Sequence, residues 1–251
     1  MSNKKKATPL IPKSELTRFG VDYATKDFEK GLREIDELPD GHRKRWILAV
    51  KKNKDDAEIL MGELRRHYPD LEWPEQLPRL GVQYHDVVPI LLHWLPRTLN
   101  PDIRASIAKA LGQRWLGRVG VEAIAASIAA TLRELPPSGG INVDIQSMIN
   151  SLITAADADD LLRVAEVGLD PKMPGTEKGL LIFLLGRRRS SSGAAALIAL
   201  MKGATEQHLV EITNELLKNR TEVARKFIEG LKEHPVASVR ELAKSGRFTK
   251  S

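Results

Sequence analysis

The chain contains no cysteine, and this absence removes several classes of protein from consideration. Disulfide bonds, thiolate catalysis and cysteine-based zinc sites are all excluded, and a protein without cysteine is at home in a reducing compartment. Aromatic residues are also scarce, at 5% of the chain, whereas alanine and leucine are abundant. Closely packed helices need such side chains, while β-sandwiches usually carry more β-branched and aromatic residues. The composition therefore favours an all-α fold.

Long apolar runs and dense charge blocks are missing as well. The longest apolar stretches, residues 179–185 and 193–201, are far shorter than a membrane span, and no signal-peptide core follows the basic start of the chain. We therefore expect a cytoplasmic protein with no membrane partner. The formal net charge is +6, but acidic and basic residues are mixed throughout. The positive net charge gives a general preference for acidic partners. The basic residues do not form the dense stripe that is seen in many nucleic-acid-binding proteins.

Motifs for catalysis and cofactor binding are not found either. The sequence has no phosphate-binding Gly-Lys-Ser/Thr loop, no dinucleotide fingerprint and no His-Glu-x-x-His zinc motif. His85 and His93 could share one helix face, but two histidines without a third ligand are more typical of surface or packing positions than of a metal site. Asp157, Asp159 and Asp160 lack the glycine and distal glutamate of a calcium loop and are expected to cap the next helix. We predict no catalytic residue, no metal and no cofactor, which favours a binding protein over an enzyme.

The chain divides into four predicted parts. Residues 1–13 combine a lysine cluster with two prolines and no periodic pattern, so we expect a disordered basic tail. Residues 14–68 carry apolar residues at helical spacing and predict an N-terminal helical subdomain. Residues 69–84 hold three prolines within ten positions, which excludes a long helix, while their leucines and tryptophan predict a linker that packs down. The remaining residues, 85–251, are predicted to form an array of helices.

Apolar periodicity predicts that this array contains five pairs of helices. The units begin roughly 30–40 residues apart, which is within the range of two-helix solenoid repeats. A single pair of this kind cannot bury its apolar face, so the pairs are expected to stack on one another. The predicted pairs are 85–95 with 102–115, 119–135 with 143–155, 159–167 with 175–185, 193–201 with 206–218, and 221–233 with 237–245.

The first and last pairs resemble HEAT repeats. That family places Pro and Asp in the turn between the two helices, followed by a Val/Ile-Arg pair and small residues that end near Leu-Gly. Residues 101–112, Pro-Asp-Ile-Arg-Ala-Ser-Ile-Ala-Lys-Ala-Leu-Gly, match this second helix almost position for position, and residues 235–243 are similar with Ser238 where an acidic residue is common. The resemblance implies an armadillo-like α-solenoid, an α-α superhelix of HEAT-like helix pairs. The resemblance also implies that Arg104 and Arg240 have structural roles. Arg104 is expected to reach turn carbonyls or an aspartate of the adjacent repeat.

The first candidate binding site is the run Arg187, Arg188 and Arg189, which precedes three serines. In one interpretation the arginines stabilise the end of a helix and the serines cap the next one. In the other, the run is a surface for phosphate or carboxylate groups, because three adjacent arginines repel one another unless something pairs them. We expect Arg188 to be exposed and its replacement by alanine to leave stability almost unchanged.

The second candidate site is the group Arg114, Trp115 and Arg118 between the first two pairs. Trp115 is either a core residue or an exposed aromatic flanked by guanidinium groups, a composition that is common at interface anchors. Trp46 and Trp94 lie within the apolar periodicity and are predicted to belong to the core.

The repeat pattern, together with the missing catalytic motifs, predicts a non-enzymatic scaffold or adaptor. The second helices of the pairs would form a concave face that binds a protein partner. The alternative is a DNA- or RNA-binding HEAT-like protein such as a DNA glycosylase, since some members of the family hold a duplex in a basic concave groove. None of their catalytic motifs is found here. Positive charge on the second-helix face would favour this alternative, whereas a mixed or acidic face would count against it.

Overall fold

The computed structural model describes residues 55–98, 100–134 and 143–246. Helices account for 73% of these residues, and no strand occurs among them, which confirms the all-α class. The chain divides into two compact units, residues 1–59 and 60–251. The predictions for residues 1–13, for most of 14–68 and for Trp46 lie outside the described residues. None of the helices in the described ranges is long and apolar enough to cross a membrane.

The second unit begins within a helix that covers residues 55–65, and the proline-rich segment follows. This segment contains no α-helix and forms the short 3₁₀ helix η1 (Pro74–Leu80), which packs on α5 (Pro101–Leu111). Leu77 and Tyr84 are fully buried there. The Tyr84 hydroxyl donates to the Ala110 carbonyl at 2.5 Å, and the Glu75 amide donates to Ser106 Oγ at 3.0 Å. The segment is therefore part of the packed structure.

The helices that follow end close to the predicted positions wherever a proline, glycine or cap residue marks the boundary. Asn100, Ser190, Thr205 and Thr221 each accept a hydrogen bond from the first turn of the helix they precede. The α-helices are α4 (Val88–Trp94), α5 (Pro101–Leu111), α6 (Arg118–Glu134), α7 (Val143–Ala155), α8 (Leu161–Gly168), α9 (Gly175–Gly186), α10 (Ser191–Leu200), α11 (Glu206–Lys218), α12 (Glu222–Leu231) and α13 (Ala237–Ser245). Two more 3₁₀ helices lie between them, η2 (Arg114–Leu116) and η3 (Ala158–Asp160).

Two predicted boundaries are wrong in the first pair. The helix predicted over 85–95 begins only at Val88, and the helix predicted over 102–115 ends at Leu111. At Gly112 the chain passes so close to α7 that a Cβ atom would lie 2.9 Å from Ser151 Cβ. Trp115 therefore lies on η2, in the turn that leads to α6, and not on the predicted helix.

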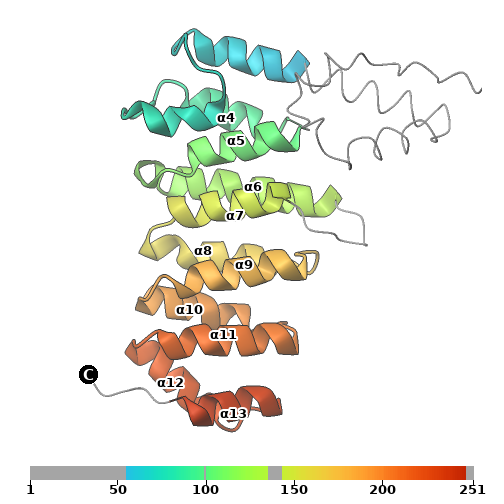
Figure 1. The fold of residues 1–251 in the computed structure, drawn as a ribbon, viewed down its shortest axis with the longest axis vertical. Helices are drawn as coiled ribbons and strands as arrows, with labels where there is room; N and C mark the ends of the chain where they lie inside the picture. Colours follow the sequence, from blue (N-terminus) through green and yellow to red (C-terminus); the bar gives the residue numbers. More distant parts are fainter. Residues whose placement is uncertain (1–54, 99, 135–142, 247–251) are drawn as a thin grey trace, which may run out of the picture. The chain divides into compact units, whose positions relative to one another are not determined.

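The helices from α5 onward pack in two rows (Figure 1). In the odd row each of α5, α7, α9, α11 and α13 packs on the next, and in the even row α6, α8, α10 and α12 do the same. Each even-row helix also packs on the odd-row helix that follows it in the chain. The core lies between the rows and consists mostly of leucine, isoleucine and alanine. Gly168 shows how tightly it is filled, because a Cβ atom there would lie 2.6 Å from Leu181 Cδ2 and 2.7 Å from Leu200 Cδ2.

The turns that follow the odd-row helices lie along one edge of this stack (Figure 1). We call this the turn edge, and it comprises residues 112–117, 156–160, 187–190 and 219–221, together with Arg118, the first residue of α6. Both arginine clusters that the sequence singles out belong to it. The turn edge thus brings together residues that are far apart in the sequence.

Candidate partner-binding surface

Arg104 is held in a buried polar network that joins three helices. Its Nη2 donates to the Thr98 carbonyl at 2.9 Å, and its Nη1 donates to Thr131 Oγ1 at 2.8 Å and to Asp144 Oδ2 at 3.1 Å. The Arg104 side chain is 11% exposed and that of Asp144 is 6% exposed. Burial raises the pKa of Asp144 to about 6, although the adjacent guanidinium acts in the opposite direction. As expected, Arg104 binds a turn carbonyl and an aspartate of the next pair, so its role is structural.

Arg240 has a similar role near the C-terminus. Its Nη1 donates to the carbonyl oxygens of His234 at 2.7 Å and of Pro235 at 3.3 Å, in the turn before α13. The guanidinium thereby fixes the turn between α12 and α13. Neither of the two signature arginines is therefore available to a partner.

Trp115 and the two histidines that the sequence singles out have contacts within the protein. The half-buried Trp115 ring packs edge-on against buried Tyr84, with 5.1 Å between ring centroids, and against His85 at 4.5 Å. His93 lies on α4, where its Nδ1 is 3.0 Å from Arg97 Nη1. His85 precedes α4, so the two histidines do not share a helix face. No group of three or more potential metal ligands occurs within the described residues.

Arg114 and Arg118 are exposed on the turn edge, and acidic residues accompany both. Arg114 Nε lies 4.0 Å from Asp157 Oδ1, and Arg118 Nε lies 3.7 Å from Glu122 Oε1 one helical turn along α6. Asp160 Oδ2 accepts a hydrogen bond from the Asp157 amide at 3.3 Å, in the turn that leads into α8. Asp157 and Asp160 therefore form the capping box of η3, whereas no side chain caps α8, so the predicted capping of the helix that begins near Leu161 is wrong. The acidic residues also reduce the positive charge of this cluster.

The side chains of the three consecutive arginines have different surroundings. Arg187 is exposed, and its guanidinium carbon lies 5.9 Å from the centroid of the Phe183 ring. Arg188 is half-buried, and its Nη2 donates to the Ile153 carbonyl at the end of α7. Arg189 is exposed. The expectation of an exposed Arg188 is therefore wrong, because its guanidinium binds a carbonyl that the helix itself leaves unpaired.

A fourth arginine joins this cluster through the next turn. The fully buried Asn219 donates from Nδ2 to the Ser190 carbonyl at 3.0 Å, which places the turns 187–190 and 219–221 side by side. The exposed Arg220 follows Asn219 directly. Among the described residues, no acidic side chain forms an ion pair with Arg187, Arg189 or Arg220. Sequence analysis did not find Arg220, because a single arginine so far along the chain shows no local pattern.

A groove between α9 and α11 lies on the odd row, next to Arg187 of this cluster. Its volume is about 230 Å³, and the exposed Phe183 ring stands at its side. Lys218 Nζ pairs with Glu215 Oε1 at 2.6 Å. Sequence analysis missed Phe183, because it lies in an apolar run that resembles a core segment. The lining residues are Gly179, Ile182, Phe183, Glu211, Asn214, Glu215 and Lys218.

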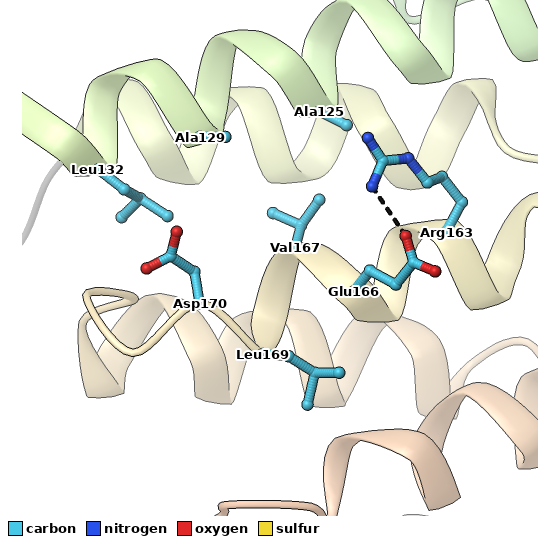
Figure 2. Close-up of a pocket in the computed structure, with 8 residues that line it drawn as sticks. All are labelled: Ala125, Ala129, Leu132, Arg163, Glu166, Val167, Leu169 and Asp170. Carbon is cyan, nitrogen blue, oxygen red and sulfur yellow. Dashed lines mark hydrogen bonds and ion pairs between the residues drawn. The ribbon is translucent and has the colours of Figure 1, made fainter.

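A second groove, of about 280 Å³, lies between α6 and α8 on the even row (Figure 2). Arg163 is already paired, with its Nη1 2.8 Å from Glu166 Oε2 and its Nε 3.0 Å from Glu122 Oε2. These hydrogen bonds raise the pKa of Arg163. Asp170 lies at the end of the groove opposite Arg163 (Figure 2). The groove is lined by apolar residues and by charged residues that already have partners within the protein, which is typical of a helix–helix contact. The lining residues are Ala125, Ala129, Leu132, Arg163, Glu166, Val167, Leu169 and Asp170.

The solvent-facing side of the odd row carries charges of both signs. Its α7 segment is neutral and polar, with Gln146, Asn150 and Thr154 at the surface. On α5, Lys109 is paired with Glu75 at 2.6 Å. The last two helices of the row carry more acidic than basic residues at the surface. They are Glu206, Glu211, Glu215 and Lys218 on α11 and Glu241 and Lys244 on α13.

Comparison of the chain with protein-family models, with curated proteins and with solved structures gives no match.

Proposed function

We propose that residues 85–246 form a HEAT-like α-solenoid and that the protein is a non-enzymatic scaffold or adaptor that binds a protein partner through the odd row. Two features support the solenoid. Each helix packs on the next but one along the chain, and Arg104 links the first pair to Asp144 of the second pair. An array built from such nearest-neighbour contacts presents one extended surface along each row.

The observation that carries this proposal is the exposure of Phe183. Its side chain is 50% exposed on the odd row, beside the α9–α11 groove and within reach of Arg187. Exposed aromatic side chains next to arginine are enriched at the energetic centres of protein interfaces. Neutral polar residues and charged residues of both signs surround Phe183, as in the polar rim around such centres.

The same surface gives little support to the nucleic-acid alternative. Binding to a duplex relies on several lysines and arginines that neutralise consecutive phosphates. On the odd row, Lys109 and Lys218 are both paired with glutamates. In contrast, Glu206, Glu211 and Glu241 form no ion pair with a basic residue in the described part of the chain. A duplex laid along this row would therefore meet repulsive carboxylates.

Site-specific photo-crosslinking tests the proposed function. A photoreactive phenylalanine analogue is placed at position 183 of the full chain and, in a matched control, at position 162. Leu162 is 52% exposed on α8 of the even row. After irradiation in extract from the native source, crosslinked proteins are identified by mass spectrometry. We expect one protein that is crosslinked from position 183 and not from position 162, because only position 183 lies at the proposed interface.

Two results would refute the proposed function. One is an identical set of crosslinked proteins from both positions, which would show that position 183 has no specific partner. The other is binding of a DNA duplex with a Kd below about 1 μM at about 150 mM salt, together with loss of that binding after charge reversal on the odd row.

A further inference from the structure

We propose that Arg187, Arg189 and Arg220 form a docking patch for an acidic segment of the partner protein, whose apolar residue enters the adjoining α9–α11 groove. This inference rests on the proposed function, because it specifies the chemistry of the partner on the same surface. The three arginines are called the basic patch below.

The basic patch is assembled by two turns that pack against each other. Asn219 is fully buried and its amide holds the Ser190 carbonyl at 3.0 Å, so the positions of the two turns are fixed relative to each other. Ser190 also accepts a hydrogen bond from the Gly193 amide at 3.0 Å, which fixes the start of α10. The backbone that carries the three arginines is therefore held in place before a partner binds, and little ordering entropy is lost on binding.

The charge of the basic patch is unbalanced. Most other arginines on the same edge are engaged: Arg114 lies near Asp157, Arg118 lies near Glu122, and Arg188 binds the end of α7. In contrast, no acidic side chain among the described residues forms an ion pair with Arg189 or Arg220. Three like charges on neighbouring turns repel one another, and carboxylates from a partner would relieve this repulsion with charge-assisted hydrogen bonds.

The groove specifies a second feature of the occupant. The Phe183 ring, which lies at 5.9 Å from the Arg187 guanidinium, also lines the groove between α9 and α11. A segment that crosses from the basic patch into this groove would place carboxylates on the arginines and an apolar side chain against Phe183 and Ile182. At about 230 Å³ the groove has room for a side chain of leucine size.

The surroundings of the basic patch favour an acidic peptide over nucleic acid. η3, which carries the exposed Asp159, packs on α10, the helix that begins directly after the turn 187–190. After the second turn, 219–221, Glu222 is paired with Lys226 at 3.6 Å. The patch is thus short and is flanked by elements that carry acidic residues, whereas a duplex needs positive charge over many consecutive phosphates.

Fluorescence anisotropy with defined probes tests the inference on the full chain. The probe is a fluorescein-labelled peptide of aspartate and glutamate residues around one central leucine. Comparison peptides carry asparagine and glutamine at the acidic positions, or glycine in place of leucine. We expect the acidic leucine peptide to bind with a Kd in the micromolar range at about 150 mM salt, the neutral peptide not to bind, and the glycine peptide to bind about tenfold more weakly.

Matched charge-reversal variants locate the binding site. In the patch variant Arg187, Arg189 and Arg220 are changed to glutamate. In the control variant three other exposed cations that lie outside the odd row, Arg66, Arg133 and Lys202, are changed in the same way. We expect the patch variant to bind the acidic peptide at least about tenfold more weakly and the control to lose less than about twofold. Circular dichroism shows whether both variants keep their helical content, and the wild-type peptide comparisons do not depend on any variant.

Each remaining outcome contradicts the inference. Equal weakening in both variants would show attraction by net charge alone, and equal binding of acidic and neutral peptides would show that carboxylates are not recognised. A short DNA duplex that binds the patch more tightly than the acidic peptide at about 150 mM salt would identify a nucleic-acid site instead. If the protein crosslinked from position 183 is still captured by the patch variant, the basic patch is dispensable while the proposed function stands. If no protein is crosslinked from position 183 or from position 162, the two sets of crosslinked proteins are identical and the proposed function itself fails.

Discussion

Replacement of Arg104 by leucine tests the buried network that joins the first two helix pairs. The change removes the guanidinium from Asp144 Oδ2, from Thr131 Oγ1 and from the Thr98 carbonyl at once. Asp144 Oδ1 already has no hydrogen-bond partner, so the whole carboxylate would be left buried and unpaired. Removal of one partner of a buried ion pair typically lowers the free energy of unfolding by about 3–5 kcal/mol. A loss of this size is a large part of the roughly 5–15 kcal/mol that stabilises a domain.

The pH dependence of this loss gives a sharper test. The pKa of Asp144 is raised from 3.8 to about 6 in the folded protein, so the folded state binds this proton more tightly than the unfolded state. The contribution of Asp144 to the free energy of unfolding is therefore greatest below pH 3.8 and falls as pH rises to about 6, by about 3 kcal/mol in all. Without Arg104 the carboxylate loses its stabilising partner, its pKa rises further, and the decline continues to higher pH.

Urea unfolding followed by circular dichroism measures the effect. We expect Arg104→Leu to lower the free energy of unfolding by about 1–2 kcal/mol at about pH 4.5, where Asp144 is mostly protonated, and by about 3–5 kcal/mol at about pH 7.5. The double variant Arg104→Leu/Asp144→Leu should regain at least about half of the loss at the higher pH, because it no longer buries an unpaired charge. Two findings would refute this reasoning: an equal loss at both pH values, or a double variant no more stable than Arg104→Leu.

Three further predictions concern residues outside this network. Arg188→Ala should lower the free energy of unfolding by about 1–2 kcal/mol in urea titrations, because it leaves a carbonyl at the end of α7 without its donor; Arg189→Ala is the control and should change it by less than about 0.5 kcal/mol. Tyr84→Phe should cost about 1 kcal/mol by the same measurement, since the Ala110 carbonyl loses a buried hydrogen bond; an unchanged midpoint would show that this bond adds nothing. Leu111→Asp should abolish the cooperative thermal transition, because a fully buried carboxylate without a partner costs several kcal/mol.

Local signals in the sequence were sufficient for the all-α class and for most helix boundaries. The predicted ranges of α7, α11 and α13 agree with the structure, since helical periodicity and turn residues act over a few neighbouring positions. The interpretation of Arg104 also held, because a Pro-Asp-Ile-Arg turn places the guanidinium next to its own turn and the following pair.

Only the tertiary structure decided which residues reach the surface and which meet there. Phe183 lies in the apolar second half of α9, where periodicity does not indicate which side chains face solvent, and the packing of α9 against its neighbours leaves this ring exposed. Arg188 and Arg189 are adjacent and chemically identical, yet one binds the end of α7 and the other faces solvent. Arg220 joins Arg187 through a buried asparagine that links two turns far apart in the chain. Exposure and proximity of this kind depend on contacts between helices, and a pattern read along the chain contains no information about them.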